Sequence, residues 1–347
     1  MFPGLFWENT GKRSIACNGR EKFTMKKVAL IIPYYGKFHN YFPIWVQTAS
    51  YNLPFDFFLI TDIETDLALP ANLHVVKKSF AELREEIKAL FDFEIILDTP
   101  YKLCEYRPVY GRVFSGMLQD YAFWGYCDVD LLFGDISSFI TDEIFNNNDA
   151  ILSHGHFTLF RNTEQMNNLY LSVKGRGDLS YKQAYATKFS CHFDEWSGIS
   201  QYIEDIGIPR FDKMVFADIL YKWFDFRPAQ YRDDGNQRIY RWGEGVLTEY
   251  TLLKDGSVTE TERMYLHLQK RPMKWDGQIR NSYLIVPNEI LDGDCMVDAE
   301  LIRRWSKKKL VYWHYLRLRK RHIFNKIAVI IEERCSTRIK KRKDMQG

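Results

Sequence analysis

A run of five apolar residues, Val28–Ile32, most constrains how this chain can fold. Such a run is typical of a strand buried on both faces of a parallel sheet. It ends at a loop signal, Pro33-Tyr34-Tyr35-Gly36. The next segments predict a helix, two strands and a helix, at 42–51, 55–60, 73–76 and 80–90. This order predicts an α/β fold with a mixed, mainly parallel sheet flanked by helices.

Two aspartates, Asp128 and Asp130, directly follow the aromatic strand-like segment Phe123–Cys127. Residues i and i+2 of an extended segment point to the same side, so the two carboxylates can face one ligand. Paired carboxylates suit a hard divalent cation such as Mn²⁺ or Mg²⁺. We therefore predict both as metal ligands; the alternative is a solvated turn, because this short motif is common.

A second polar segment lies late in the chain, where the apolar residues 264–266 precede His267 and Lys270. Histidine binds divalent metals, and a following Lys-Arg pair favours phosphate. Earlier, Lys102 and Arg107 precede the two aspartates and could face the same ligand. The alternative for each of these residues is an ordinary packed or solvated side chain.

Two acidic residues, Asp194 and Glu195, stand beside Trp196, on which a sugar could stack. They are candidates for the general base of a transfer reaction; the alternative is that they cap a helix. Further expected elements are helices at 111–118, 136–145, 166–173 and 211–223, strands from 150 and at 157–162, and a hairpin turn at Asp255-Gly256.

The net charge of +3 conceals a basic C-terminal segment. Residues 303–347 contain 16 Lys and Arg against 3 Asp and Glu, so the rest of the chain is acidic. Basic residues interleaved with Trp313 and with apolar residues at helical spacing predict an interfacial helix on an anionic membrane. Nucleic acid is the less favoured partner, because no recognised binding motif accompanies the charge. A solvated helix packed on the domain is the third interpretation.

The apolar stretches and the cysteines of the sequence indicate in which cellular compartment the protein is expected. No stretch approaches the ~18 apolar residues of a membrane span, and six scattered cysteines without a C-x-x-C pair fit a reducing cytosol. We expect a cytoplasmic protein associated peripherally with the inner face of the cell membrane. We also expect Met25 to be the natural start and residues 1–24 to be an irregular upstream extension.

The loop at 33–36, the Asp128-Val-Asp130 motif and the His267-Leu-Gln-Lys270 segment together resemble a bacterial nucleotide-sugar-dependent glycosyltransferase of the GT-A fold. The resemblance covers roughly residues 26–275. It implies a GT-A-like, Rossmann-like fold with a basic helical tail, and it implies a reaction that transfers a sugar during capsule, exopolysaccharide or lipopolysaccharide synthesis. The shorter spacing from His267 to Lys270, and Arg271-Pro272-Met273 after it, depart from the family pattern.

The resemblance also implies roles for particular residues. The metal, Mn²⁺ or Mg²⁺, would be held by Asp128, Asp130 and His267. The UDP- or GDP-sugar would be contacted by Pro33, Tyr34, Tyr35, Asp62, Lys102, Arg107, Asp128 and Lys270. Residues 25–150 would form the donor half and 151–275 the acceptor half, which takes a glycan or a lipid-linked acceptor, and 276–347 would form the basic, aromatic tail.

Two other functions remain open from the sequence. A phosphatase of the haloacid-dehalogenase type also uses an Asp-x-Asp motif, although it expects an apolar lead-in strand and Thr or Val where Leu132 stands. A non-catalytic membrane-associated scaffold would need only the basic tail.

Overall fold

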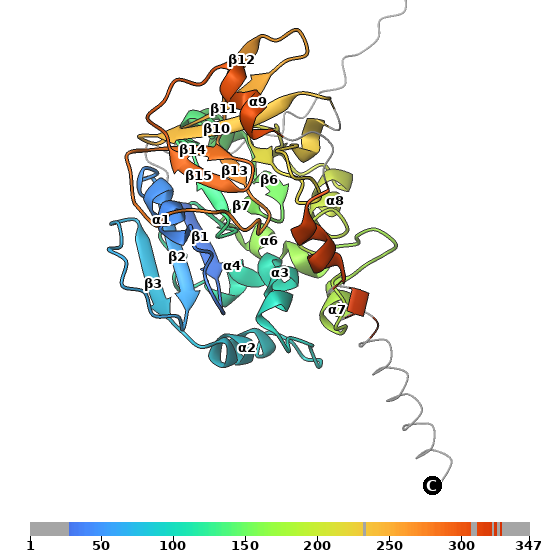
Figure 1. The fold of residues 1–347 in the computed structure, drawn as a ribbon. Coiled ribbons are helices and arrows are strands. Elements are labelled where there is room, and N and C mark those ends of the chain that lie inside the picture. Colours follow the sequence, from blue (N-terminus) through green and yellow to red (C-terminus); the bar gives the residue numbers. More distant parts are fainter. Residues whose placement is uncertain (1–27, 232–233, 307–310, 321–322, 325–326, 328–347) are drawn as a thin grey trace, which may run out of the picture.

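The apolar run at 28–32 forms β1 (Val28–Pro33), inside a seven-stranded sheet. The protein is described by a computed structural model that covers residues 28–231, 234–306, 311–320, 323–324 and 327 (Figure 1). The strands of this sheet lie in the order β3 (Leu73–Lys77), β2 (Phe55–Thr61), β1, β4 (Phe123–Cys127), β7 (Phe157–Arg161), β6 (Ala150–His154) and β8 (Arg210–Phe211). Strands β1 to β4 run parallel, and β7 is antiparallel to both of its neighbours. The predicted mixed, mainly parallel sheet is therefore confirmed.

Alternate side chains of β1 point to opposite faces of the sheet and enter two different cores. Val28, Leu30 and Ile32 pack with α1 (Phe42–Ser50) on one face. Ala29 and Ile31 pack on the other face with a larger group of helices. Those helices are α2 (Phe80–Lys88), α3 (Leu103–Tyr106), α4 (Tyr110–Val113), α6 (Glu164–Asn167), α7 (Tyr181–Tyr185) and α8 (Ile199–Asp205). Because both faces are covered, every residue from 28 to 32 is buried.

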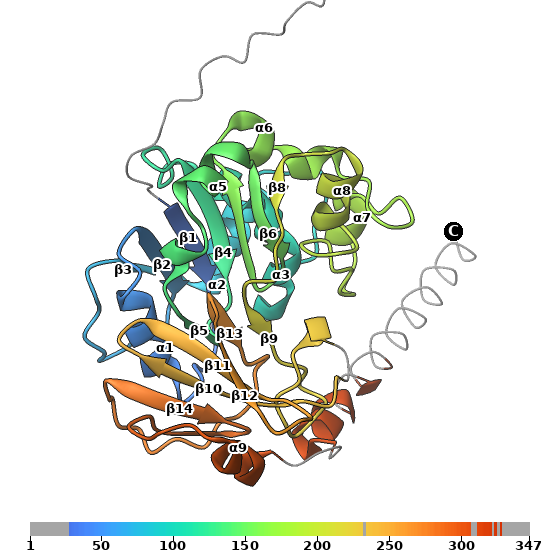
Figure 2. The same ribbon diagram turned by 90° about the horizontal axis from the view of Figure 1, so that it is seen from above.

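Two smaller sheets complete the described chain (Figure 2). One is antiparallel, in the order β12 (Val258–Glu262), β11 (Val246–Leu252), β10 (Gln237–Gly243), β14 (Ser282–Val286) and β15 (Glu289–Asp292), with α9 (Ala299–Trp305) packed on it. The other joins β5 (Leu131–Phe133), β13 (Tyr265–His267) and β9 (Ala217–Asp218). Figure 2 shows this three-stranded sheet between the two larger ones, so it connects them.

The elements expected between 28 and 90 are all present, with bounds that differ by one or two residues. The strands expected from 150 and at 157–162 are also confirmed, and they pair with each other as β6 and β7. The hairpin turn at Asp255-Gly256 is confirmed by the antiparallel pairing of β11 with β12. In the middle of the chain the helix predictions fail. The helix expected at 111–118 is limited to α4, the one at 136–145 is a 3-10 turn followed by α5 (Asp142–Asn147), and the one at 166–173 is α6 followed by a 3-10 turn.

The helix predicted at 211–223 is wrong, because these residues pair with distant strands instead. β8 pairs with β6, and β9 pairs with β13, so the apolar side chains of Phe216, Ala217 and Ile219 are buried by tertiary contacts. Local spacing cannot reveal partners that lie 50 residues away in the sequence.

At the C-terminus, residues 313–320, 323–324 and 327 are helical. The basic helical tail as a whole stays a prediction, because much of it lies outside the described residues. Residues 1–24 and Met25, with the start-site prediction made for them, lie outside the described residues, as do 328–347.

Candidate metal centre

The chain leaves β4 at Cys127 and turns through Asp128 and Asp130 into β5. In the sheet order, β1 has β2 on one side and β4 on the other, so successive connections depart in opposite directions from β1. Ligands of open α/β sheets bind at the carboxyl ends of the strands beside such a point. The turn is fixed by the Asp128 N–H, which donates to the His156 carbonyl at 3.0 Å. The indole of Trp45 donates to the Asp128 carbonyl at 3.2 Å.

His267 reaches the same place through strand pairing. It lies opposite Leu131 of β5 and beside Asp218 of β9. Its Nε2 is 3.5 Å from Asp130 Oδ1 and 3.8 Å from Asp128 Oδ2. One ligand atom from each of these three side chains fits within 4.8 Å of the others, which is close enough to hold one metal ion. The structure thus brings together the three metal ligands that the resemblance implies.

Asp130 is buried, and only one of its two carboxylate oxygens accepts a hydrogen bond from the described residues. Its Oδ2 accepts a hydrogen bond from the backbone N–H of Lys270. Its Oδ1 is buried and accepts no hydrogen bond from the described residues. Gln269 and Lys270 both adopt left-handed backbone angles, with φ of 50° and 57°, which turn the Lys270 N–H toward the carboxylate. The nearest positive group to this oxygen is His267 Nε2, at 3.5 Å. A buried carboxylate oxygen that accepts no hydrogen bond fits a cation, because burying it in that state is costly.

The charges of this group compensate one another. Burial alone would lower the pKa of His267, but Asp130 and Asp218 raise it to about 10. Burial alone would raise the pKa of Asp130, but His267 and Lys270 hold it below its usual range. A positive charge is therefore stabilised between the carboxylates. A divalent cation would take the place of the imidazolium proton, because a metal-bound histidine must be neutral.

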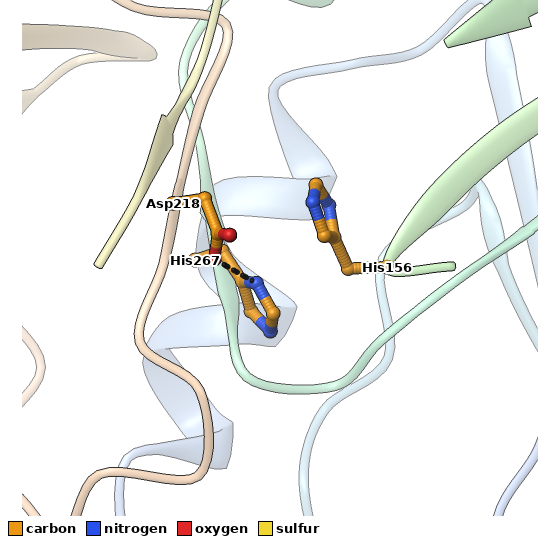
Figure 3. Close-up of side chains that lie close together, drawn as sticks. All are labelled: His156, Asp218 and His267. Carbon is orange, nitrogen blue, oxygen red and sulfur yellow. Dashed lines mark hydrogen bonds and ion pairs between the residues drawn. The ribbon is translucent and has the colours of Figure 1, made fainter. Parts of the chain in front are cut away.

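Behind His267 lies a second set of polar side chains that the sequence interpretation missed (Figure 3). Asp218 Oδ1 is 2.7 Å from His267 Nδ1, and it accepts a hydrogen bond from Gln269 Nε2 at 2.6 Å. The ring of His156 lies 4.5 Å from that of His267, between centroids. His156, Asp218 and His267 also meet the distance criterion for a metal-binding group. The sequence does not identify Asp218 as a site residue, because it predicts that residues 211–223 form a helix.

Arg107 links the metal group to the candidate bases. Its guanidinium forms ion pairs with Asp128 and, at 3.1 Å, with Asp194, and it donates to the Gly155 carbonyl. Burial raises the pKa of the Asp194 carboxyl, an effect that Arg107 opposes. Glu195 lies 3.5 Å from His192 and its side chain is 36% exposed, against 3% for Asp194. Neither acid caps α8, whose N-cap is Gly198.

Lys102 lies apart from this group. Its ammonium donates to the carbonyls of Ala184 and Phe189, at 3.1 and 2.6 Å, so it is engaged with backbone. The neighbouring Glu105 carboxylate accepts four hydrogen bonds from residues 190–193 and fixes the loop that leads to Asp194. In contrast, the ammonium of Lys270 lies 4.6 Å above the ring of Tyr101, and the Asp128 and Asp130 charges help to raise its pKa.

The candidate donor-binding residues at the strand ends are Pro33, Tyr34, Tyr35 and Asp62. Pro33 ends β1 and Tyr34 follows it, where burial and the Asp130 carboxylate raise the pKa of the tyrosine. Tyr35 turns toward α2, since its hydroxyl donates to the Ser79 carbonyl at 3.5 Å. Burial and then the charge of the exposed Asp62 raise the Tyr35 pKa. The Asp130 charge therefore acts on Tyr34, whereas the Asp62 charge acts on Tyr35.

Comparison with known proteins places these residues within one family. No curated protein matches the chain. Within the described parts of the chain, no helix is both long and apolar enough to cross a bilayer. A model described as a family of unknown function (DUF6625) matches residues 30–294, more than three quarters of the sequence, and this range includes Asp128, Asp130, Asp194, Asp218 and His267. The chain therefore belongs to this family of unknown function, DUF6625.

Proposed function

We propose that the chain is a metal-dependent glycosyltransferase with a GT-A-like fold, which moves a sugar from a nucleoside-diphosphate sugar to a glycan or lipid-linked acceptor. One observation supports this most: Asp128, Asp130 and His267 converge at the carboxyl edge of a mainly parallel sheet, with Lys270 beside them. Surface polysaccharide synthesis is the setting that the sequence resemblance suggests.

Each residue has a defined task in this proposal. Asp128, Asp130 and His267 would hold Mn²⁺ or Mg²⁺, and the bound cation would neutralise the negative charge that develops on the leaving diphosphate. Lys270 would add a second positive charge against the same phosphates. The strand-end residues Tyr34, Tyr35 and Asp62 would contact the nucleoside.

The acceptor hydroxyl would form a bond to the anomeric carbon as the bond to the diphosphate oxygen breaks. In an inverting reaction the hydroxyl proton must pass to a base. Glu195 suits this better than Asp194, because it is more exposed, whereas the Asp194 carboxylate is buried against Arg107. In a retaining reaction neither carboxylate is required as this base; Asp194 would then serve to position Arg107, and the more exposed Glu195 would contact the acceptor.

A panel of UDP- and GDP-sugars tested for Mn²⁺-dependent hydrolysis and for thermal stabilisation would test the proposal. We expect one donor to be hydrolysed, and we expect EDTA to abolish this activity. Asp130→Asn should reduce the activity about 100-fold or more, while the exposed Asp120→Asn should have no effect. Full activity of Asp130→Asn or of the EDTA-treated protein would refute the metal-dependent reaction.

The same panel separates the two alternative functions. A phosphatase of the haloacid-dehalogenase type would release phosphate from simple phosphomonoesters and carry a phosphoryl group on Asp128. A non-catalytic scaffold would show neither turnover nor metal-dependent stabilisation by any nucleotide.

A further inference from the structure

The C-terminal helical residues expose several large apolar side chains. Trp313 is 80% exposed and Phe324 is 58% exposed. Leu316, Ile323 and Ile327 are each between 43% and 48% exposed. Single exposed apolar residues are common on protein surfaces, but a contiguous set marks an interaction surface.

Helical spacing along the sequence assigns these five residues to one face. At 3.6 residues per turn, positions 313, 316, 320, 323, 324 and 327 fall within roughly one third of a helical circumference. Arg317 and Lys320 lie on the same face and are also exposed. The face therefore combines apolar residues with positive charge; we refer to Trp313, Leu316, Arg317, Lys320, Ile323, Phe324 and Ile327 as the basic apolar face.

The opposite side of the helix is held against the body of the protein. Tyr315 is buried, and its ring contacts that of Tyr221 with 5.3 Å between centroids. Just before the helix, the Tyr312 N–H donates to the Lys222 carbonyl at 2.9 Å. Because these contacts use the other side of the helix, they leave the basic apolar face open.

We propose that the basic apolar face docks on an anionic lipid bilayer, with Trp313 and the aliphatic side chains in the interface and Arg317 and Lys320 on lipid phosphates. A tryptophan and aliphatic residues interleaved with cations are what an interfacial helix requires. The charge of the whole chain supports lipid as the partner. Outside residues 303–347 the chain holds 32 Lys and Arg against 42 Asp and Glu, so the acidic body is repelled by an anionic surface and only this end approaches it.

Docking would also orient the metal centre. The guanidinium of Arg271 lies 5.2 Å from the ring centroid of Tyr312, and Arg271 directly follows Lys270 in the chain. The same guanidinium donates to the carbonyls of Leu220, Trp223 and Phe224. The helix and the Lys270 turn are thus fixed to one segment, 220–224. If the proposed transfer holds, this placement favours a lipid-linked acceptor; the docking itself does not depend on that reaction.

Vesicle flotation of the full-length chain would test the docking. We expect it to float with vesicles that contain about one third phosphatidylglycerol in phosphatidylcholine, to remain behind with pure phosphatidylcholine, and to bind less at 0.5 M salt. Trp313→Ser with Phe324→Ser should reduce the vesicle-bound fraction about tenfold. Met296→Ser, which removes an 84% exposed side chain outside this face, is the matched control and should bind as the parent protein does.

Thermal unfolding of each variant would confirm that the body remains folded. Equal flotation of the parent and the double variant would overturn the proposal. So would binding of a single-stranded RNA oligonucleotide without any binding to vesicles, which would identify nucleic acid as the partner. A dimer that depends on Trp313 and Phe324 and does not bind vesicles would likewise overturn it, in favour of a second copy of the chain.

Discussion

Asp218 fixes which nitrogen of His267 faces the metal group. Its carboxylate lies 2.7 Å from Nδ1, and Gln269 donates to the same oxygen, so Nδ1 carries a proton that is held by Asp218. Nε2 is then left to face Asp128 and Asp130, at 3.8 and 3.5 Å. A carboxylate behind a histidine commonly orients the ring and increases its strength as a metal ligand.

Removing this support should weaken metal binding without removing a ligand. We expect Asp218→Ala to lower the affinity for Mn²⁺ about 10- to 100-fold, measured by electron paramagnetic resonance of free Mn²⁺. Asp218→Asn keeps an oxygen that accepts from Nδ1 and should lose less affinity. Identical Mn²⁺ affinity in the parent and the alanine variant would show that Asp218 does not orient His267.

At the scale of the elements, the approach of β4 to β7 depends on Gly125. A Cβ atom at this position would lie 1.9 Å from the carbonyl oxygen of Thr158, so any side chain forces the two strands apart. Strand β4 leads directly to Asp128, and therefore the position of the candidate metal ligands depends on this close contact.

Gly125→Ala should lower the free energy of unfolding by about 1–3 kcal/mol, as overpacking of a well-packed core does. Urea unfolding followed by circular dichroism would measure this. Gly116→Ala is the matched control, because nothing lies within 4 Å of its added Cβ and its φ is not positive. A Gly125→Ala variant as stable as this control would contradict the packing argument.

The sequence predicts an element well where the pattern within that segment alone indicates which of its residues are buried. Val28–Ile32 and 55–60 are strands with continuous apolar runs, and α2 has both helical spacing and a Ser79–Glu82 capping box. Between 111 and 223 the strands at 150–154 and 157–161 are confirmed, but the helix predictions fail. The helix predicted at 211–223 fails because β8 and β9 are defined by strands far away in the sequence. Asp218 is missed for this reason: its functional neighbour is His267, and only the pairing of β9 with β13 reveals it.

The sequence also predicts some residues of the candidate site better than others. Asp128, Asp130 and His267 could be proposed from residue type and resemblance, and the structure places them together. Lys102 could be proposed as a ligand contact on charge alone, yet its ammonium binds backbone carbonyls. Charge in a sequence identifies a potential donor but not the partner that satisfies it.

At the scale of the whole molecule, Trp242 of β10 joins the five-stranded sheet to the rest of the protein. Its indole is fully buried, and Nε1 donates to the carbonyl of Phe133 at the end of β5, at 2.8 Å. Strand β5 in turn pairs with β13, which presents His267. The metal group therefore lies at a junction that depends on contacts between all three sheets.

Trp242→Phe should leave the Phe133 carbonyl buried without its donor and lower the free energy of unfolding by about 1–3 kcal/mol. The 53% exposed Trp196 provides the control, and Trp196→Phe should change the stability by less than about 0.5 kcal/mol. Chemical denaturation of the two variants in parallel would distinguish them. Equal stability would mean that the indole hydrogen bond does not contribute to holding the sheets together.

The pairing of β13 with β5 has a consequence for biosynthesis. His267 follows Asp130 by 137 residues, and the ribosome adds roughly 5–20 residues per second, so about 7–27 s separate the two ligands during translation. During that interval the nascent chain holds the Asp-x-Asp turn without the histidine that completes the group. The proposed capture of an ion by all three side chains would therefore wait until most of the chain has been made, so metal loading would be a late, essentially post-translational event.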